Sequence, residues 1–200
     1  MYMTRVILKN VPQPETIHSL LLAAFPGENS DKTHERLWRV DKLEEHTELL
    51  VVSINTPELQ HIAQEDARNK TLNYTPLLAR LANGQEWNFR LCANPVEHKK
   101  KNTSDKRVKV YALRSAAEQL EWLNKQSSKH GFHVKECAVL HEEWRTNTND
   151  KTNTTRILAV TFEGCLAITD AEAFREALIH GIGGGKTLGC GLLSVAREIP

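Results

Sequence analysis

Alternating and helical hydrophobic patterns follow one another in a regular order along the first half of this chain. Residues 2–9 alternate apolar and polar positions, which predicts a strand. Residues 14–25 place apolar side chains at helical spacing, and Pro14 is a favoured first helical residue, so this stretch predicts a helix. Residues 36–42 and 47–55 then predict two strands joined by a short acidic turn.

A short helix and one more strand complete this unit. The helix is predicted to begin at Thr56 and to end near Ala67. Asn83-Gly84 is a hairpin-type turn, and the strand predicted after it covers residues 86–95 and stops at Pro95. The first half therefore has the order β-α-β-β-α-β.

The second half repeats this order. Ser115 and Glu118 form a capping box that predicts a helix to about Lys129, and Asp170 is placed to cap a second helix to about His180. The strands of this half are predicted at 107–113, 132–144, 155–168 and 192–196.

Two β-α-β-β-α-β units predict an α+β protein with two ferredoxin-like domains in tandem. We expect an N-terminal domain over residues 1–95, a basic linker over 96–106, and a C-terminal domain with a glycine-rich loop over 107–200.

Composition places the chain among soluble globular proteins. It has 200 residues, of which 40% are hydrophobic and 26% charged. No apolar run approaches the ~18 residues of a membrane helix, and the N-terminus lacks the apolar region of a secretory signal. The four cysteines are spaced too widely for a CxxC pair. We therefore expect free thiols, a cytoplasmic location and no membrane partner.

Basic charge is concentrated near the middle of the chain. The net charge is +1 overall, but residues 99–114 hold seven basic residues against one acid. A field of this density favours a partner that carries phosphates. The commoner role of a lysine run is a solvated connector, so both interpretations stay open for each residue.

A cluster of His130, His133, Cys137 and His141 superficially resembles metal-ligand spacing. The last three are predicted on a strand, where positions four apart are ~13 Å from one another. Side chains so far apart do not converge on one ion, which needs ligands at ~2 Å. We therefore predict no metal site and no cofactor.

Six of the ten glycines lie between His180 and Gly191. The end of this segment looks like a phosphate-binding P-loop, but it follows a predicted helix and precedes a strand, which is the reverse of the P-loop order. A helix cap and a bulged strand would need only one or two glycines. The remaining interpretation is a loop pressed against a sugar–phosphate backbone, with Lys186 as its counter-charge.

Four stretches together resemble a known family. They are GIGGGKTLGCGLLSVA near the C-terminus, FRLCANP near the middle, EQLEWLNKQ in the second-half helix and FEGCLAITD before the last helix. In this combination and order the chain resembles CasE, the CRISPR repeat-processing endoribonucleases of type I-E systems. The resemblance covers essentially the whole chain.

The resemblance implies a metal-independent cut of precursor CRISPR RNA at the 3′ base of the repeat stem-loop. The ribose 2′-hydroxyl is the nucleophile, a cyclic phosphate is left, and the protein stays on the hairpin as a Cascade subunit. The family's catalytic histidine corresponds to His18. Some members carry a tyrosine three positions earlier, where this sequence has Glu15. The second catalytic group is therefore open, with Lys186 as a candidate.

Two sets of residues are expected to bind the RNA. The glycine-loop set is Gly183, Gly184, Gly185, Lys186, Gly189 and Gly191, and the basic set is Lys99, Lys100, Lys101, Lys106, Arg107 and Lys109. Arg145 and Lys151 are weaker candidates, and the tryptophans are expected mostly in the core. We expect a monomer when free. The alternatives are a non-catalytic RNA-hairpin-binding subunit and a regulatory module that binds a small anion.

Overall fold

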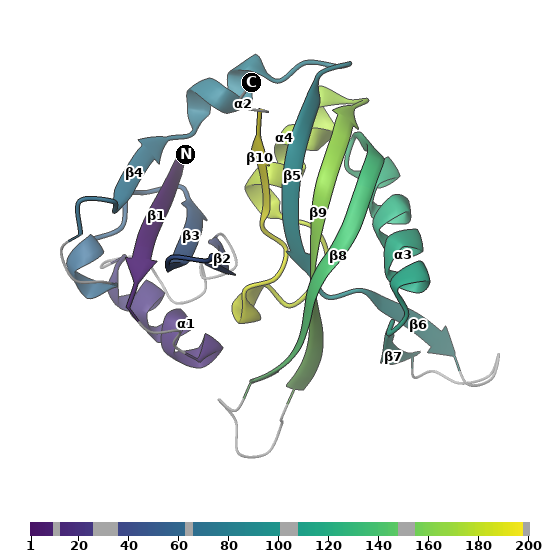
Figure 1. Ribbon diagram of the computed structural model, residues 1–200, viewed down its shortest axis with the longest axis horizontal. Helices are drawn as coiled ribbons and strands as arrows, with labels where there is room; N and C mark the ends of the chain where they lie inside the picture. The colour runs from purple at the N-terminus through teal and green to yellow at the C-terminus, as the bar shows by residue number, and fades with distance from the viewer. Residues whose placement is uncertain (10–12, 26–35, 63–65, 101–107, 148–154, 198–200) are drawn as a thin grey trace.

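Two four-stranded antiparallel sheets form the body of the molecule (Figure 1). The computed structural model describes residues 1–9, 13–25, 36–62, 66–100, 108–147 and 155–197. The first sheet has the order β2-β3-β1-β4. Its strands are β1 (Tyr2–Leu8), β2 (Leu37–Lys42), β3 (Thr47–Ser53) and β4 (Lys70–Asn73). This is the strand order of a ferredoxin-like domain.

The second sheet has the equivalent order, β10-β5-β9-β8. Its strands are β5 (Glu86–Ala93), β8 (Phe132–Asn147), β9 (Thr155–Ile168) and β10 (Leu193–Ala196). Helices α3 (Ala116–Lys129) and α4 (Ala171–His180) are its two crossover connections. The predicted α+β fold of two tandem ferredoxin-like domains is confirmed.

The strand predicted over 86–95 belongs to the second domain, contrary to our assignment of residues 1–95 to the first. It is β5, and it pairs with β9 from Glu86↔Ala167 to Ala93↔Val160 and with β10 on its other side. The first sheet is closed instead by β4, whose four residues, KTLN, have too little apolar pattern to reveal a strand. The change of sheet therefore falls between β4 and β5.

Residues 96–100 and 108–112 form a separate two-stranded hairpin, β6 (Val96–Lys100) and β7 (Val108–Ala112). The stretch 107–113 was predicted as the opening strand of the second domain, and 96–106 as a linker. Residues 96–100 form a strand rather than a linker, and residues 101–107 lie outside the described part of the chain. Residues 108–112 form a strand as predicted, but β5 occupies the opening position of the second sheet, and among the described strands β7 pairs with β6 alone. The hairpin is an insertion between β5 and α3, and it projects beside α3 in Figure 1.

The helix boundaries follow their capping residues closely. The Ser115 hydroxyl accepts a bond from the Glu118 amide at 3.3 Å, while the Glu118 carboxylate accepts one from the Ser115 amide at 3.2 Å. Asp170 caps α4 by accepting bonds from the amides of Glu172 and Ala173, at 3.0 and 3.2 Å. Both predicted caps are confirmed.

Three short helical segments depart from the prediction. Residues 56–67 were expected to form a helix, whereas the described part is a single 3-10 turn, η2 (Leu59–His61). Helix α2 (Thr75–Arg80) was not predicted, and it connects the two domains between β4 and β5. A third short segment, η3 (Lys186–Leu188), lies inside the glycine-rich loop.

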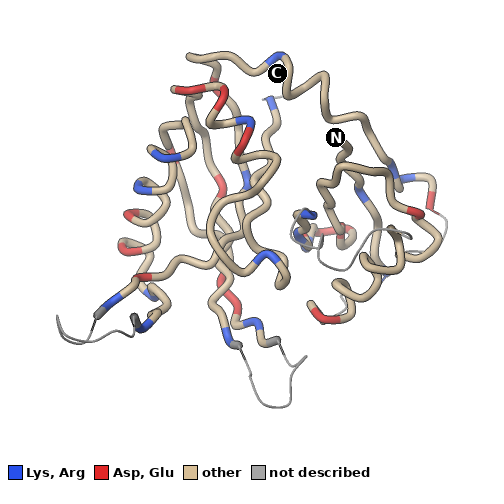
Figure 2. The backbone as a smooth tube through the Cα atoms, turned by 180° about the vertical axis from the view of Figure 1, so that it is seen from behind, with Lys and Arg blue, Asp and Glu red and all other residues tan. Residues whose placement is uncertain are grey.

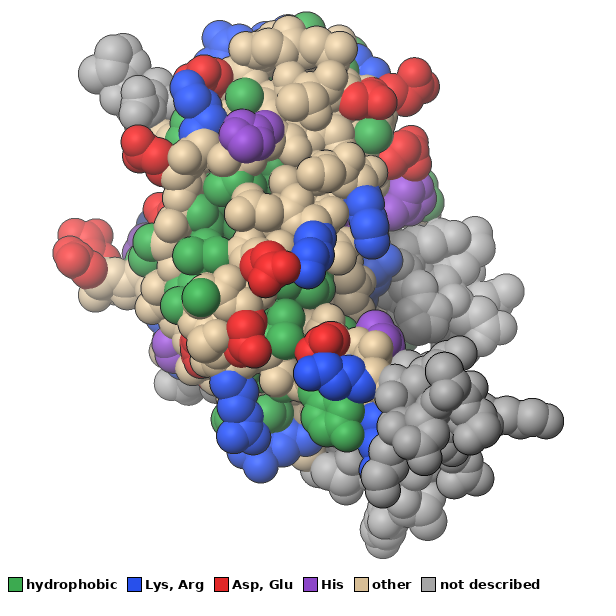
Figure 3. Space-filling view, turned by 90° about the vertical axis from the view of Figure 1, so that its right-hand side faces the viewer, with side chains coloured by type: hydrophobic (Ala, Val, Ile, Leu, Met, Phe, Trp, Pro, Cys, Tyr) green, Lys and Arg blue, Asp and Glu red, His purple; other side chains and the backbone are tan. Residues whose placement is uncertain are grey.

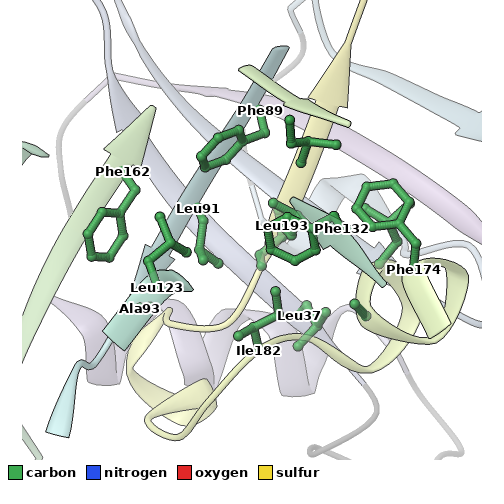
Figure 4. Close-up of a cluster of buried hydrophobic side chains, with 14 of the residues drawn as sticks. Leu37, Phe89, Leu91, Ala93, Leu123, Phe132, Phe162, Phe174, Ile182 and Leu193 are labelled. Carbon is green, nitrogen blue, oxygen red and sulfur yellow. The ribbon is translucent and has the colours of Figure 1, made fainter. Parts of the chain in front are cut away.

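The hydrophobic core spans both domains. Figure 4 shows Leu37 of β2 beside Ile182 of the glycine-rich loop, within the cluster that Phe89, Leu91 and Phe162 form in the second sheet. A second core lies under α1 (Pro14–Ala23) in the first domain. Because one apolar cluster is continuous between the domains, we expect them to move together.

A buried arginine adds polar contacts between the two domains. Arg39 of β2 is 3% exposed, forms a bidentate pair with Asp41, and donates to the carbonyls of Arg90 at 2.8 Å and Leu192 at 3.2 Å. It also donates to the Ser194 hydroxyl at 2.9 Å. Since β2 and β10 are edge strands of different sheets, Arg39 fixes one sheet against the other. Among the described helices, none is long and apolar enough to cross a membrane.

Candidate active site and nucleic-acid surface

Helix α1 holds His18 at the edge of its buried face. Ile17 and Leu21 are 2% and 3% exposed and pack in the core of the first domain, whereas His18 is only partly buried. The helix begins at Pro14, which fixes the register of these positions. His18 therefore stands at the boundary between core and solvent, where a ring can meet a substrate.

The glycine-rich loop brings Lys186 to the same place. A small hollow is lined by His18, Leu21 and Leu22 from α1, by Arg36 and Trp38 at the start of β2, and by Lys186 and Thr187 from η3. Lys186 is 168 positions further along the chain than His18. The structure thus places together the two side chains that were singled out as catalytic candidates.

Arg36, Trp38 and Thr187 are residues of this hollow that the sequence did not indicate. Arg36 is 5% exposed, and its guanidinium carbon lies 4.3 Å from the centre of the Phe25 ring. Trp38 is 3% exposed and belongs to the core of the first domain. No local pattern marks these positions, because their relation to His18 arises only when β2 packs beside α1 and η3.

The backbone conformation of the loop explains five of its six glycines. Gly181, Gly183, Gly185, Gly189 and Gly191 all adopt positive φ values, a region that side chains disfavour. A Cβ on Gly189 would also lie 2.6 Å from the Trp38 ring. The sequence argument that six glycines exceed structural need was therefore too strong, because this tightly wound loop needs five of them.

Gly184 is the exception. Its φ lies outside the left-handed region, it is exposed, and a Cβ built on it would meet nothing within 4 Å. It lies with Gly183 at the border of a groove of about 740 Å³ between the β6–β7 hairpin and α3. Of the predicted RNA-binding glycines, Gly184 is the one whose small size the fold does not explain.

The groove next to Gly184 carries charges of both signs. Lys99 on β6 pairs with Glu97 at 2.8 Å, and this hydrogen bond raises the pKa of Lys99. On α3, Lys125 pairs with Glu121 at 2.7 Å. Figure 3 shows blue and red side chains interleaved over the side of the molecule that carries α3 and the hairpin. The groove is therefore less positive than the lysine count alone predicts.

The predicted basic set is only partly placed by the structure. Lys99 and Lys109 face each other across the hairpin as a register pair, and both are exposed. Lys101, Lys106 and Arg107 lie outside the described residues, and so does the side chain of Lys100. Figure 2 shows basic positions on both strands of the hairpin, close to the strand ends next to residues 101–107, which are drawn in grey.

The tryptophans and Arg145 divide between core and surface. Trp38, Trp87 and Trp122 are buried as expected, whereas Trp144 on β8 is 41% exposed. The guanidinium carbon of Arg156 lies 4.4 Å from the centre of the Trp144 ring. Arg145, the next residue along β8, has a side chain only 10% exposed, and it lines a hollow of about 850 Å³ between β2 and β8. Lys151, the other weak candidate, lies outside the described residues.

Comparison with known proteins agrees with this arrangement. The family model described as CRISPR associated protein matches residues 1–197. The chain belongs to this family. The predicted resemblance is thereby confirmed over nearly the full length of the chain.

Two curated CRISPR-associated proteins match along their whole lengths. The CRISPR-associated endoribonuclease Cse3 of Thermus thermophilus is 27% identical over 217 residues, which cover 98% of this chain and 100% of the relative. The CRISPR system Cascade subunit CasE of Escherichia coli K-12 is 28% identical over 212 residues, covering 98% and 99%.

Solved structures of the CRISPR-associated family share the fold. The structure of CRISPR endoribonuclease Cse3 bound to a 19-nucleotide RNA has a TM-score of 0.81 and 26% identity, and the match covers 98% of this chain and 100% of that one. The Cas6e protein of Escherichia coli K-12 has a TM-score of 0.72 and 26% identity over 99% and 100%. Both matches therefore include the two sheets and the glycine-rich loop.

Proposed function

We propose that this protein is an endoribonuclease that cuts precursor CRISPR RNA at the base of a repeat stem-loop. The observation that carries the proposal is the hollow shared by His18 and Lys186. An imidazole that titrates near neutrality can take up or release a proton, and an ammonium group can stabilise charge on a phosphate. The relative named as a CRISPR-associated endoribonuclease supports this activity.

The proposed reaction uses only groups of the RNA and of the protein. The 2′-oxygen attacks the adjacent phosphorus, the bond from phosphorus to the 5′-oxygen breaks, and a cyclic phosphate and a 5′-hydroxyl result. His18 accepts the 2′-hydroxyl proton or gives one to the leaving 5′-oxygen, and each such role contributes about 10²- to 10⁴-fold in rate. Lys186 offsets the charge that develops on the phosphate.

The surface around the hollow suggests where the stem lies. The groove bordered by Gly184, the β6–β7 hairpin and α3 lies on the second domain, beside the loop that carries Lys186. A stem-loop in this groove would place its phosphates near Lys99 and Lys109, and its base near His18. Contacts of this kind recognise shape and phosphate positions, and they weaken with salt.

The comparisons also support a structural role after the cut. One relative is named as a Cascade subunit. We propose that this chain likewise stays on the hairpin of the mature RNA and joins other Cascade subunits through it. The free protein is then expected to be a monomer, since its RNA, rather than a second copy, provides the assembly platform.

The decisive experiment is cleavage of a repeat RNA in EDTA, with a matched RNA that carries a 2′-deoxy group at each candidate cut site in turn. A single cut that one deoxy position blocks is the expected result. The His18→Ala variant should lose cleavage and keep its RNA affinity within about twofold. Equal loss of both would make His18 structural. Tight binding by the wild type without any cut would favour the non-catalytic hairpin-binding subunit, and loss of cutting in EDTA would refute the metal-free mechanism.

A further inference from the structure

Arg145 follows the exposed Trp144 on β8, but its own side chain is largely withdrawn from solvent. Its side chain is 10% exposed, and its Nη1 atom donates to the carbonyl oxygen of Leu188 at 2.6 Å. Its Nε atom donates to the Glu143 carboxylate at 2.7 Å, and Nη2 contacts the same oxygen. The guanidinium is thus engaged on one side by a carboxylate and on the other by the backbone of the glycine-rich loop.

Leu188 is the last residue of η3, the single turn that carries Lys186 and Thr187 to the His18 hollow. Within this turn the Leu188 amide bonds to the Gly185 carbonyl at 2.9 Å, and the Gly189 amide to the Lys186 carbonyl at 3.1 Å. One 3-10 turn between two left-handed glycines has little stability of its own. Its orientation must therefore come from contacts outside it.

Two contacts with the second domain hold the turn, which also packs against α1. The Leu188 side chain is buried in a small core with Ile157 and Ala159 of β9 and with Cys92 and Cys190. This apolar contact holds η3 against the second sheet but sets no direction for its carbonyls. The Arg145 bond supplies that direction, because a hydrogen bond from a charged donor is both short and directional.

We propose that Arg145 is a positioning residue for the cleavage reaction, holding η3 through the Leu188 carbonyl so that Lys186 faces His18. The proposal rests on the proposed function. Arg145 does not contact the RNA in this arrangement. Its loss displaces a catalytic group and leaves the phosphate contacts of the binding groove intact.

Single-turnover cleavage and equilibrium RNA binding distinguish a positioning role of Arg145 from a direct contact with the RNA. Arg145→Met should slow cleavage by about 10- to 100-fold and change the RNA Kd by less than about twofold. Arg145→Lys should recover part of the rate, because an ammonium group can still donate to the Leu188 carbonyl. Arg80→Met, which removes an exposed arginine of α2, is the matched control for lost charge and should cut at the wild-type rate.

The Glu143 carboxylate loses its arginine partner in Arg145→Met and keeps His141 as a neighbour at 3.6 Å, so the folding of this variant must be checked. The double variant Glu143→Gln/Arg145→Met removes that charge as well, so it tests the same bond in a folded protein. Circular dichroism melting of each variant identifies the folded ones. If the folded double variant cuts at the wild-type rate, the proposal is wrong.

A double-mutant cycle tests whether Arg145 affects the cleavage rate through Lys186. If Arg145 acts through Lys186, Arg145→Met should slow a Lys186→Ala enzyme by less than about twofold. Independent, multiplied effects would overturn the proposal. So would weaker RNA binding with a smaller salt slope, since this result would make Arg145 a direct phosphate contact. A wild type that does not cut at all would instead overturn the proposed function.

Discussion

Replacing Gly189 by alanine tests whether the glycine-rich loop is built as described. The residue has φ +77°, and a Cβ there would lie 2.6 and 2.8 Å from the Trp38 ring and 2.9 Å from the Arg145 guanidinium. Trp38 is 3% exposed, so its ring cannot turn out into solvent. The added methyl group therefore strains the backbone and overlaps with the Trp38 ring, which cannot move aside.

The magnitude follows from these two contributions. A left-handed backbone costs a non-glycine residue about 1–2 kcal/mol, and overpacking a tight site costs about 1–3 kcal/mol. The free energy of unfolding should fall by about 2–5 kcal/mol. For a protein of this size each kcal/mol corresponds to about 2–4 °C, so the Tm should drop by roughly 4–20 °C.

Gly184→Ala is the control from the same loop. A Cβ at Gly184 meets nothing within 4 Å, so the Tm should change by an amount equivalent to less than about 0.5 kcal/mol. If the RNA contacts the protein closely at Gly184, the Kd of Gly184→Ala for RNA should rise about tenfold, or 1.4 kcal/mol, without any loss of stability. Thermal melting and RNA titration of both variants give this contrast.

Equal melting temperatures for Gly189→Ala and the wild type would refute the packing described for the loop. An unchanged RNA Kd for Gly184→Ala would remove this glycine from the RNA surface, and the groove beside it would then need another explanation.

Other changes test the domain contact, the basic surface and the Glu143–Arg145 ion pair. Arg39→Met removes the bidentate partner of Asp41, whose side chain is 11% exposed, and one donor to each of two carbonyls, so urea unfolding should show a loss of about 3–5 kcal/mol. Replacing Lys99 and Lys109 together by alanine should weaken RNA binding and reduce its salt slope by up to about 2, whereas an unchanged slope would make the hairpin a spacer. Burial alone would raise the pKa of Glu143, but the charge and hydrogen bond of Arg145 lower this pKa overall. The pair therefore stabilises the folded protein above about pH 4, and this contribution is lost as the pH falls below that value. Urea unfolding between pH 3 and 7 should show this loss in the wild type, and Arg145→Met should lack it.

Local sequence patterns determined most of the elements. The strand at 155–168 and the helix that begins after Ser115 appear with the expected boundaries, because alternation and capping are properties of neighbouring residues. The order of the glycine-rich loop, between a helix and a strand, also follows from the sequence. His18 was found only through the family resemblance, since a histidine at the edge of an apolar helix face has no distinctive pattern.

Tertiary structure alone decided which elements share a sheet and which side chains share a site. The pattern of 86–95 predicts a strand but does not identify its partners, and the pairing with β9 places this strand in the second domain. The same holds for Arg145, whose sequence position gives no sign that it points inward to the Leu188 carbonyl. Local periodicity records which face of an element is apolar. Partners far apart in the chain are chosen by the packing of those faces, which no single segment encodes.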